Sequence, residues 1–194
     1  MAKTGDNCME RAARRLTRAS VTLTACAALA VTGTLAGSTP AHADYYSGGM
    51  PKRSFSVKTV GINGEWVKYF NTGRGNWNNA KVGANIKRKS GAKSKFTASR
   101  YQSSWYGLYA PAGSRKNRSF TIKVNARTID RDTGSISTYD KWVRSTTTHE
   151  LGHALSLDDN PNTRKSSLMK HNRSRSKVQK PQSYDKSEVK RIYK

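Results

Sequence analysis

The sequence predicts a single α+β domain. Residues 55–60 and 120–125 alternate apolar and polar side chains, which is the pattern of half-buried strands. Residues 139–155 and 183–193 instead carry apolar side chains at helical spacing. A chain of 194 residues, less an N-terminal leader, is long enough for one domain with a modest core.

The leader is predicted to occupy residues 1–43. Four arginines precede an apolar run of small residues, and Ala41-His42-Ala43 then forms a cleavage site typical of export signals. We therefore expect a secreted, extracellular protein that is cleaved near Ala43, with no transmembrane segment in its mature chain. Arg14-Arg15 leaves a twin-arginine route open, and the segment 23–26 leaves a lipoprotein box open.

The first part of the mature chain is predicted to be mostly extended. A flexible segment at 44–53 precedes the domain proper, which is expected to span 54–194. Phe55–Val60 is predicted as a strand, Gly61–Gly64 as a turn, Glu65–Phe70 as a second strand and Asn71–Gly75 as a loop. A weak helical stripe follows, formed by Trp77, Ala80 and Ala84 with Ile86 or Lys87.

Three further strands are expected before the second helix. Phe96–Tyr101 is the first, and Ser104–Pro111 is an aromatic strand that ends at a proline, as strands at a sheet edge do. Phe120–Asn125 alternates strictly and is the clearest of the three. Asp130–Gly134 is predicted as a turn, because its two acidic residues suit calcium only weakly and its glycine is misplaced for an EF-hand loop.

The helix that begins at Tyr139 or Asp140 contains candidate metal ligands. His149 and His153 are four residues apart, so on a helix both imidazoles lie on one face and can reach one ion. Zinc suits this pair, since a catalytic zinc site uses three protein ligands and a water molecule. Glu150, next to the first histidine, would flank the metal and act on its water.

A third ligand must come from beyond this helix. If the helix continued to Asp159, that carboxylate would lie about 9 Å along the axis and roughly 240° around from His153. The helix must therefore stop first, and we expect a residue in the left-handed region near Ser156-Leu157 to turn the chain back. Asp159 is then the predicted ligand, and Asp158 is the competing carboxylate.

The last part of the chain is basic and polar. His171–Lys180 is predicted as a surface loop, with His171 as a solvated histidine rather than a ligand. Ser183–Tyr193 is predicted as a closing helix, because Asp185 and Glu188 have capping-box spacing and an apolar stripe follows them.

The stretch His149–Asp159, H-E-L-G-H-A-L-S-L-D-D, resembles the signature H-E-x-x-H-x-x-G-x-x-H/D of the metzincin zinc peptidases. Met169, ten residues beyond Asp159, matches the methionine of the family's Met-turn. The surrounding residues are matrixin-like, and an aspartate as third ligand is similar to the small secreted bacterial proteases of the snapalysin type. Ser156 departs from the family's turn glycine, and Asp159 departs from its commoner histidine.

This resemblance, which covers roughly residues 54–193, implies a fold and an activity. The fold would be a small mixed sheet with an active-site helix, a Met-turn and a C-terminal helix. The activity would be endopeptidase cleavage of a protein or peptide substrate by a monomer, with extended substrate pairing with the aromatic edge strand. One zinc ion would be held by His149, His153 and Asp159, with Glu150 as general base.

The charge of the chain supports a competing hypothesis. The sequence has 36 Lys and Arg against 12 Asp and Glu, and residues 44–194 keep a net charge of +21 because they hold 31 of the basic and 10 of the acidic residues. Such a surface attracts polyanions such as nucleic acid or a cell-wall polymer. The alternative is therefore a secreted polyanion-binding protein that retains a zinc-bound metzincin fold without turnover. Both cysteines, Cys8 and Cys26, lie in the leader, so we expect no disulfide in the mature chain.

Overall fold

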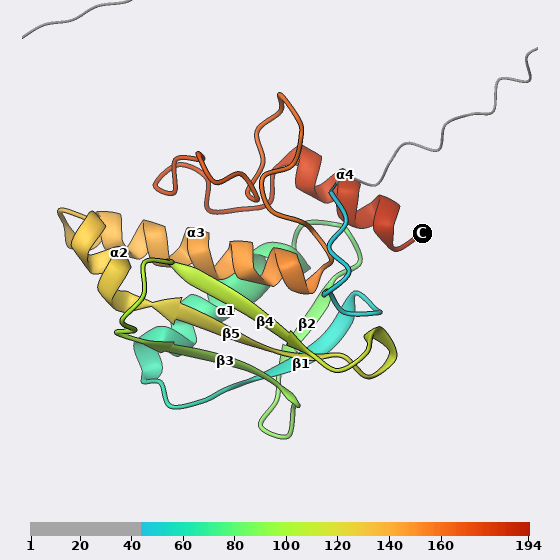
Figure 1. The fold of residues 1–194 in the computed structure, drawn as a ribbon, viewed down its shortest axis with the longest axis horizontal. Coiled ribbons are helices and arrows are strands. Elements are labelled where there is room, and N and C mark those ends of the chain that lie inside the picture. The colour runs from blue at the N-terminus through green and yellow to red at the C-terminus, as the bar shows by residue number, and fades with distance from the viewer. Residues whose placement is uncertain (1–43) are drawn as a thin grey trace, which may run out of the picture. The chain divides into compact units, whose positions relative to one another are not determined.

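The computed structural model describes residues 44–194, so the predicted export signal at 1–43 lies outside the described residues (Figure 1). In chain order the elements are β1 (Ser54–Thr59), α1 (Gly64–Asn78), β2 (Asn85–Arg88), β3 (Ser94–Ser99), β4 (Gly107–Ala112), the short 3-10 helix η1 (Arg115–Asn117), β5 (Ser119–Asn125), α2 (Ala126–Asp132), α3 (Ile136–Ala154) and α4 (Ser183–Ile192). None of the helices among these residues has both the length and the apolar character that crossing a bilayer requires.

The strands form one mixed sheet in the order β2-β1-β3-β5-β4. All pairings are parallel except that of β4 with β5, in which Gly107 pairs with Val124 and Ala112 with Ser119. The predicted α+β fold with a small mixed sheet is confirmed. The edge strand predicted at Ser104–Pro111 is present as β4, but it begins only at Gly107, and Pro111 lies within it instead of ending it.

One face of the sheet carries the hydrophobic core. Val57 in β1, Phe96 in β3 and Ile122 in β5 are fully buried, and the residues between them along each strand are more exposed. Helices α1 and α3 lie together over the core face (Figure 1), and the ring of Phe70 in α1 is 5.0 Å from that of Phe96, centroid to centroid. The sheet is therefore covered on one side, and its other side carries polar and lysine side chains.

Helices α1 and α3 approach each other closely at Gly73. A Cβ atom on Gly73 would lie 2.8 Å from Cγ2 of Thr147 in α3, so a larger residue would push the helices apart. Trp77, one turn further along α1, is fully buried, and its indole N–H donates to the carbonyl of Thr148 at 2.8 Å. α1 thus holds in place the helix that carries the two histidines.

The sequence predictions between residues 65 and 87 are wrong. The expected strand Glu65–Phe70 and loop Asn71–Gly75 both lie within α1, and the expected helix around 77–87 is the end of α1, a turn and β2. The helix starts early because the Asn63 side chain caps it, accepting a hydrogen bond from the Trp66 N–H at 3.2 Å. Its buried residues, at positions 69, 70, 73 and 77, recur at helical spacing.

Two other helix boundaries also differ from prediction. The residues expected to begin a turn at Asp130 are the last residues of α2, a short helix capped by Asn125. α3 begins at Ile136 rather than at Tyr139 or Asp140, because the Ser135 hydroxyl caps it and accepts from the Thr138 N–H at 3.3 Å. α4 agrees with the predicted closing helix, but its capping box is formed by Gln182 and Asp185 instead of Asp185 and Glu188.

Residues 44–50, expected to be flexible, instead pack against the end of α3. The Tyr46 N–H donates to the Ser156 carbonyl at 2.9 Å, and the Asp158 N–H donates to the Asp44 carbonyl at 3.1 Å. The segment lies antiparallel to the residues that follow α3, as an added strand would. The start of the described chain therefore supports the loop that carries the predicted third ligand.

Candidate metal centre

The candidate site begins with two imidazoles near the end of α3. His149 and His153 are both buried, and each Nδ1 faces a backbone carbonyl, that of Leu168 at 3.0 Å and that of Leu157 at 2.9 Å. A carbonyl only accepts, so each Nδ1 carries the proton and each Nε2 keeps its lone pair. Burial lowers the pKa of both imidazoles, that of His149 to about 3, so both are neutral at pH 7.

The chain reverses direction directly after α3. The helix ends at Ala154, and Ser156 has a φ of 63°, which confirms the predicted left-handed conformation. The Ser156 hydroxyl accepts from the Arg115 guanidinium at 3.3 Å and lies 3.1 Å from the Tyr193 hydroxyl. A glycine would remove about 1–2 kcal/mol of backbone strain but would also remove these bonds, which explains why a serine is tolerated at this turn.

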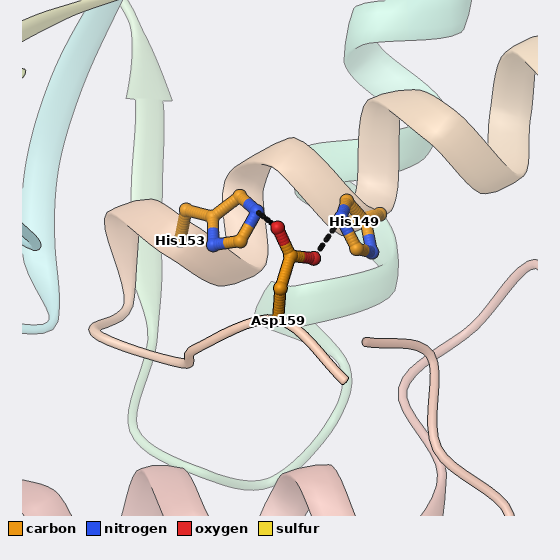
Figure 2. A group of neighbouring side chains, drawn as sticks. All are labelled: His149, His153 and Asp159. Atoms are coloured by element: carbon orange, nitrogen blue, oxygen red, sulfur yellow. Dashed lines mark ion pairs between the residues drawn. The ribbon is translucent and has the colours of Figure 1, made fainter. Parts of the chain in front are cut away.

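The turn brings Asp159 against both imidazoles. Figure 2 shows its carboxylate between the two rings, with Oδ1 3.1 Å from His149 Nε2 and Oδ2 3.6 Å from His153 Nε2. The Asp158 carboxylate instead accepts a hydrogen bond from the Asp159 N–H at 2.8 Å. Of the two aspartates that the sequence left open, Asp159 is therefore the one that lies beside the histidines.

These three side chains fit a zinc ion. One donor atom from each lies within 4.8 Å of the other two, and two neutral imidazoles with a carboxylate form a set that catalytic zinc accepts, with a fourth position for water. Burial raises the pKa of Asp159, but the histidines beside it, His149, His153 and His171, outweigh burial and hold the pKa below its ordinary value. The carboxylate is therefore ionised, as a ligand must be.

Glu150 lies in the same pocket as the three donors. Only 4% of its surface is exposed, and burial raises the pKa of its carboxyl group to about 8. Strand β4 passes beside it, since a Cβ atom on Gly107 would lie 2.3 Å from Glu150 Oε1. A carboxyl group with a pKa near neutral can both take up and release a proton at physiological pH.

The residue predicted for the Met-turn packs against α3. Met169 is almost fully buried, and a Cβ atom on Gly152 would lie 2.6 Å from its sulfur. Asp185 of α4 holds the turn from the other side, accepting from the Leu168 N–H at 2.8 Å. Since the Leu168 carbonyl faces His149, this turn links α4 to the candidate ligand.

The donors open into a pocket of about 350 Å³. One wall is formed by β4 and the residues just before it, from Trp105 to Tyr109, and another by the loop after Met169. Tyr46 of the N-terminal segment forms part of a third wall, with its ring 5.5 Å from that of His153, centroid to centroid. A ligand in this pocket would contact the edge strand and the metal donors together.

Among the pocket residues that are missing from the predicted site, three carry basic side chains. His171, Arg173 and Arg175 all come from the basic stretch after Met169, which the sequence indicates only as a surface loop. His171 is solvent-exposed, in agreement with that prediction, yet its Nε2 lies 3.2 Å from Asp159 Oδ1. The one signal that could have identified them is their position directly after the turn methionine.

The acidic residues considered for calcium have other partners in the structure. Asp130 pairs with Arg100 at 3.0 Å, and Asp132 pairs with Arg131 at 2.6 Å. Asp132 also accepts a hydrogen bond from the Tyr106 hydroxyl at 2.6 Å. Both carboxylates thus form ion pairs with arginines, and that of Asp132 also accepts a hydrogen bond from a tyrosine.

No family model matches the sequence, and no curated protein matches it. Solved structures do resemble its fold. A chain of the GM1-bound ECX AB5 holotoxin has a TM-score of 0.60 at 13% identity, over 79% of this chain and 87% of that chain. Myroilysin has a TM-score of 0.51 at 14% identity, over 77% of this chain and 97% of that chain. Archaemetzincin from Methanopyrus kandleri has a TM-score of 0.45 at 14% identity, over 74% of this chain and 95% of that chain.

Proposed function

We propose that this protein is a zinc-dependent endopeptidase. The observation that carries the proposal is that two neutral imidazole nitrogens and the ionised Asp159 carboxylate meet beside the buried Glu150 in one open pocket. The likeness to myroilysin concerns the fold alone, so the activity is proposed from the residues of the site. Assignment to the metzincin type rests on the motif His149–Asp159 and on Met169.

Each residue of the site would have a defined task in peptide hydrolysis. His149, His153 and Asp159 would hold zinc, which when bound polarises a water molecule and the scissile carbonyl. Glu150 would accept the proton of the water and pass it to the leaving amine. The two backbone carbonyls at the Nδ1 atoms keep the imidazoles in the tautomer and orientation that metal binding needs.

The substrate would lie along β4. This strand is at the edge of the sheet and borders the pocket, so an extended peptide can pair with it through backbone hydrogen bonds. Because Gly107 allows β4 to pass close to Glu150, a paired peptide would be held beside the general base. Unfolded polypeptides are the substrates that suit this geometry, and the predicted export signal would place their cleavage outside the cell.

Polyanion binding without turnover is a second candidate, and the outer face of the sheet favours it. None of the five described strands contains an acidic residue. Lys58 and Lys95 are paired in the β1–β3 register, and by strand alternation Lys87 and Lys123 lie on the same face. This face needs neither Glu150 nor the pocket, so the two functions can be tested separately.

The endopeptidase proposal is tested by incubating the secreted, zinc-loaded protein with an unstructured protein. We expect cleavage that a chelator stops and added zinc restores. Glu150→Ala should keep its zinc by elemental analysis and lose at least about a hundredfold in rate, because a general base contributes about 10²–10⁴. Glu65→Ala is the control, since that carboxylate is exposed on α1. A Glu150→Ala protein that stays fully active, or that loses its zinc, contradicts the assigned role.

A further inference from the structure

Two arginines line the pocket next to the metal donors. Arg173 and Arg175 lie in the loop after Met169 and face the same pocket as Glu150. Within residues 44–194, neither guanidinium forms an ion pair with a carboxylate at 4.0 Å or less. Carboxylates beyond ion-pair distance, such as that of Glu150, attract both guanidinium groups, but burial still lowers the pKa of each arginine. The cost of burying the two charges is therefore only partly offset, and their presence in a pocket wall points to an anionic ligand.

Neutral groups hold Arg173 in place. Its Nη1 donates to the Lys170 carbonyl at 2.8 Å, and its Nε donates to the hydroxyl of Ser145 in α3 at 3.3 Å. Burial, followed by the positive charge of Arg175, lowers the pKa of Arg173 to about 10, so the group is still charged at pH 7. Arg173 is thus repelled by Arg175 and attracted by the carboxylates of Glu150, Asp159 and Asp185, none of which is within ion-pair distance of it.

Aromatic rings hold Arg175. The central carbon of its guanidinium lies 4.3 Å from the centre of the Tyr106 ring and 5.3 Å from that of Trp142. Its buried Nε has no hydrogen-bond partner among the described residues. A guanidinium that is oriented by ring faces and keeps free N–H groups is prepared for a carboxylate, which it can bind through two parallel hydrogen bonds.

We propose that Arg173 and Arg175 form an anion subsite that selects peptides with an acidic side chain close to the scissile bond. The inference rests on the proposed endopeptidase function, because it names the substrate of the same pocket. The carboxylates already in the pocket, those of Glu150, Asp158 and Asp159, belong to α3 and its turn and form no ion pair with either arginine. A carboxylate from the substrate would accept hydrogen bonds from the guanidinium groups and reduce their mutual repulsion.

Matched peptides test the subsite. Pairs that differ only by Glu against Gln, or Asp against Asn, at each position around the cleaved bond are compared by kcat/KM. We expect the mature protein to prefer the acidic member at one position by roughly tenfold or more, the range of a hydrogen bond between charged groups. Arg175→Gln should bring this ratio close to one, and Arg175→Lys should restore part of it because the charge returns. Arg88→Gln is the control, with the same loss of charge on β2 at the opposite edge of the sheet.

A binding measurement separates failure of the subsite from failure of the enzyme. Zinc-loaded Glu150→Gln, which should not cleave, is titrated with fluorescent forms of the same peptide pairs. Tighter binding of acidic peptides without any cleavage by the unmodified protein would reject the endopeptidase and keep the subsite. Equal cleavage and equal binding of acidic and neutral peptides would reject the subsite and keep the endopeptidase. An acidic preference that Arg88→Gln reduces as much as Arg175→Gln does would also reject the subsite, since overall charge would then explain it.

Discussion

Three carboxyl groups near the site have different pKa shifts because their surroundings differ. Glu150 is enclosed by protein, and burial raises its pKa to about 8. Asp159 is partly exposed, and the imidazoles beside it outweigh burial and hold its pKa below the ordinary value. Asp185 is buried, and burial raises its pKa although it accepts hydrogen bonds from the Leu168 and Gln182 N–H groups. The surroundings thus give different pKa values to Glu150, the proposed base, Asp159, the proposed ligand, and Asp185, which accepts structural hydrogen bonds.

Asp159 and Asp158 should differ strongly when each is replaced by alanine. Asp159→Ala removes a proposed ligand, so zinc affinity should fall by more than the 10–100-fold that is roughly typical for loss of an outer-shell partner. Asp158→Ala should change zinc affinity little, because that carboxylate bonds to a backbone N–H instead of facing the imidazoles. Competition with a chromogenic chelator measures both values. If Asp158→Ala proves to be the damaging change, the assignment of the third ligand is wrong.

At the scale of elements, parts of the chain far apart in sequence support the turn after α3. The N-terminal segment bonds to the Ser156 carbonyl through Tyr46. Arg115 of η1 and Tyr193, the residue directly after α4, contact the Ser156 hydroxyl. Loops are more mobile than the helices and strands they connect, so a ligand on a loop needs such support to keep its geometry. The position of Asp159 therefore depends on three elements besides α3.

The close approach of β4 to α3 predicts that Gly107→Ala is damaging. The new methyl group would lie 2.3 Å from Glu150 Oε1 and 2.7 Å from Thr146 Cγ2, so strand and helix must separate. We expect a loss of about 1–3 kcal/mol in the free energy of unfolding, as for overpacking, and a large loss of hydrolysis with zinc retained. Urea unfolding, peptidase assay and metal analysis measure the three effects.

Gly91→Ala is the matched control for this substitution, because a Cβ atom there meets no atom within 4 Å. It should leave stability and hydrolysis almost unchanged. If Gly107→Ala behaves in the same way, the close approach of β4 to Glu150 is not needed for activity.

At the scale of the whole described domain, the two faces of the sheet have different chemistry. The inner face holds the core under α1 and α3 (Figure 1). The outer face carries lysines and no acidic residue from any of the described strands. The net charge of +21 on residues 44–194 therefore includes one sheet face whose charged strand residues are all basic. Polyphosphate chains such as duplex DNA are attracted to such surfaces through release of counterions.

Two triple variants should separate a specific basic face from a general effect of charge. Replacing Lys58, Lys95 and Lys123 by glutamine removes three charges from the outer face of the sheet, and replacing Lys141, Lys186 and Lys190 removes three from helices α3 and α4. Titration with duplex DNA at several salt concentrations measures the log–log slope, which changes by about 0.9 for each phosphate that the protein no longer neutralises. We expect a clearly smaller slope for the sheet variant alone. Equal slopes would mean that the charges act collectively, and no binding at low salt would reject polyanion binding.

The metal-binding motif and most strands could be predicted from the sequence because they depend on near neighbours. Spacing along a helix puts His149 and His153 on one face, and their distance from Asp159 requires a reversal near Ser156. Alternation of apolar residues is enough to identify β1 and β5, whereas β3 begins and ends two residues before the strand predicted at Phe96–Tyr101. These features need no information about the rest of the fold.

The remaining features depend on contacts between residues far apart in the chain. The aromatic residues of α1 resemble a strand locally, and the sequence does not show that they pack between the sheet and α3 as a helix. The choice of Asp159 over Asp158 depends on a turn held by the N-terminal segment, η1 and α4. Arg173 and Arg175 follow no periodic pattern, and their place beside Glu150 follows from the path of a loop around the pocket. Burial and long-range hydrogen bonds, which local sequence does not encode, select these arrangements.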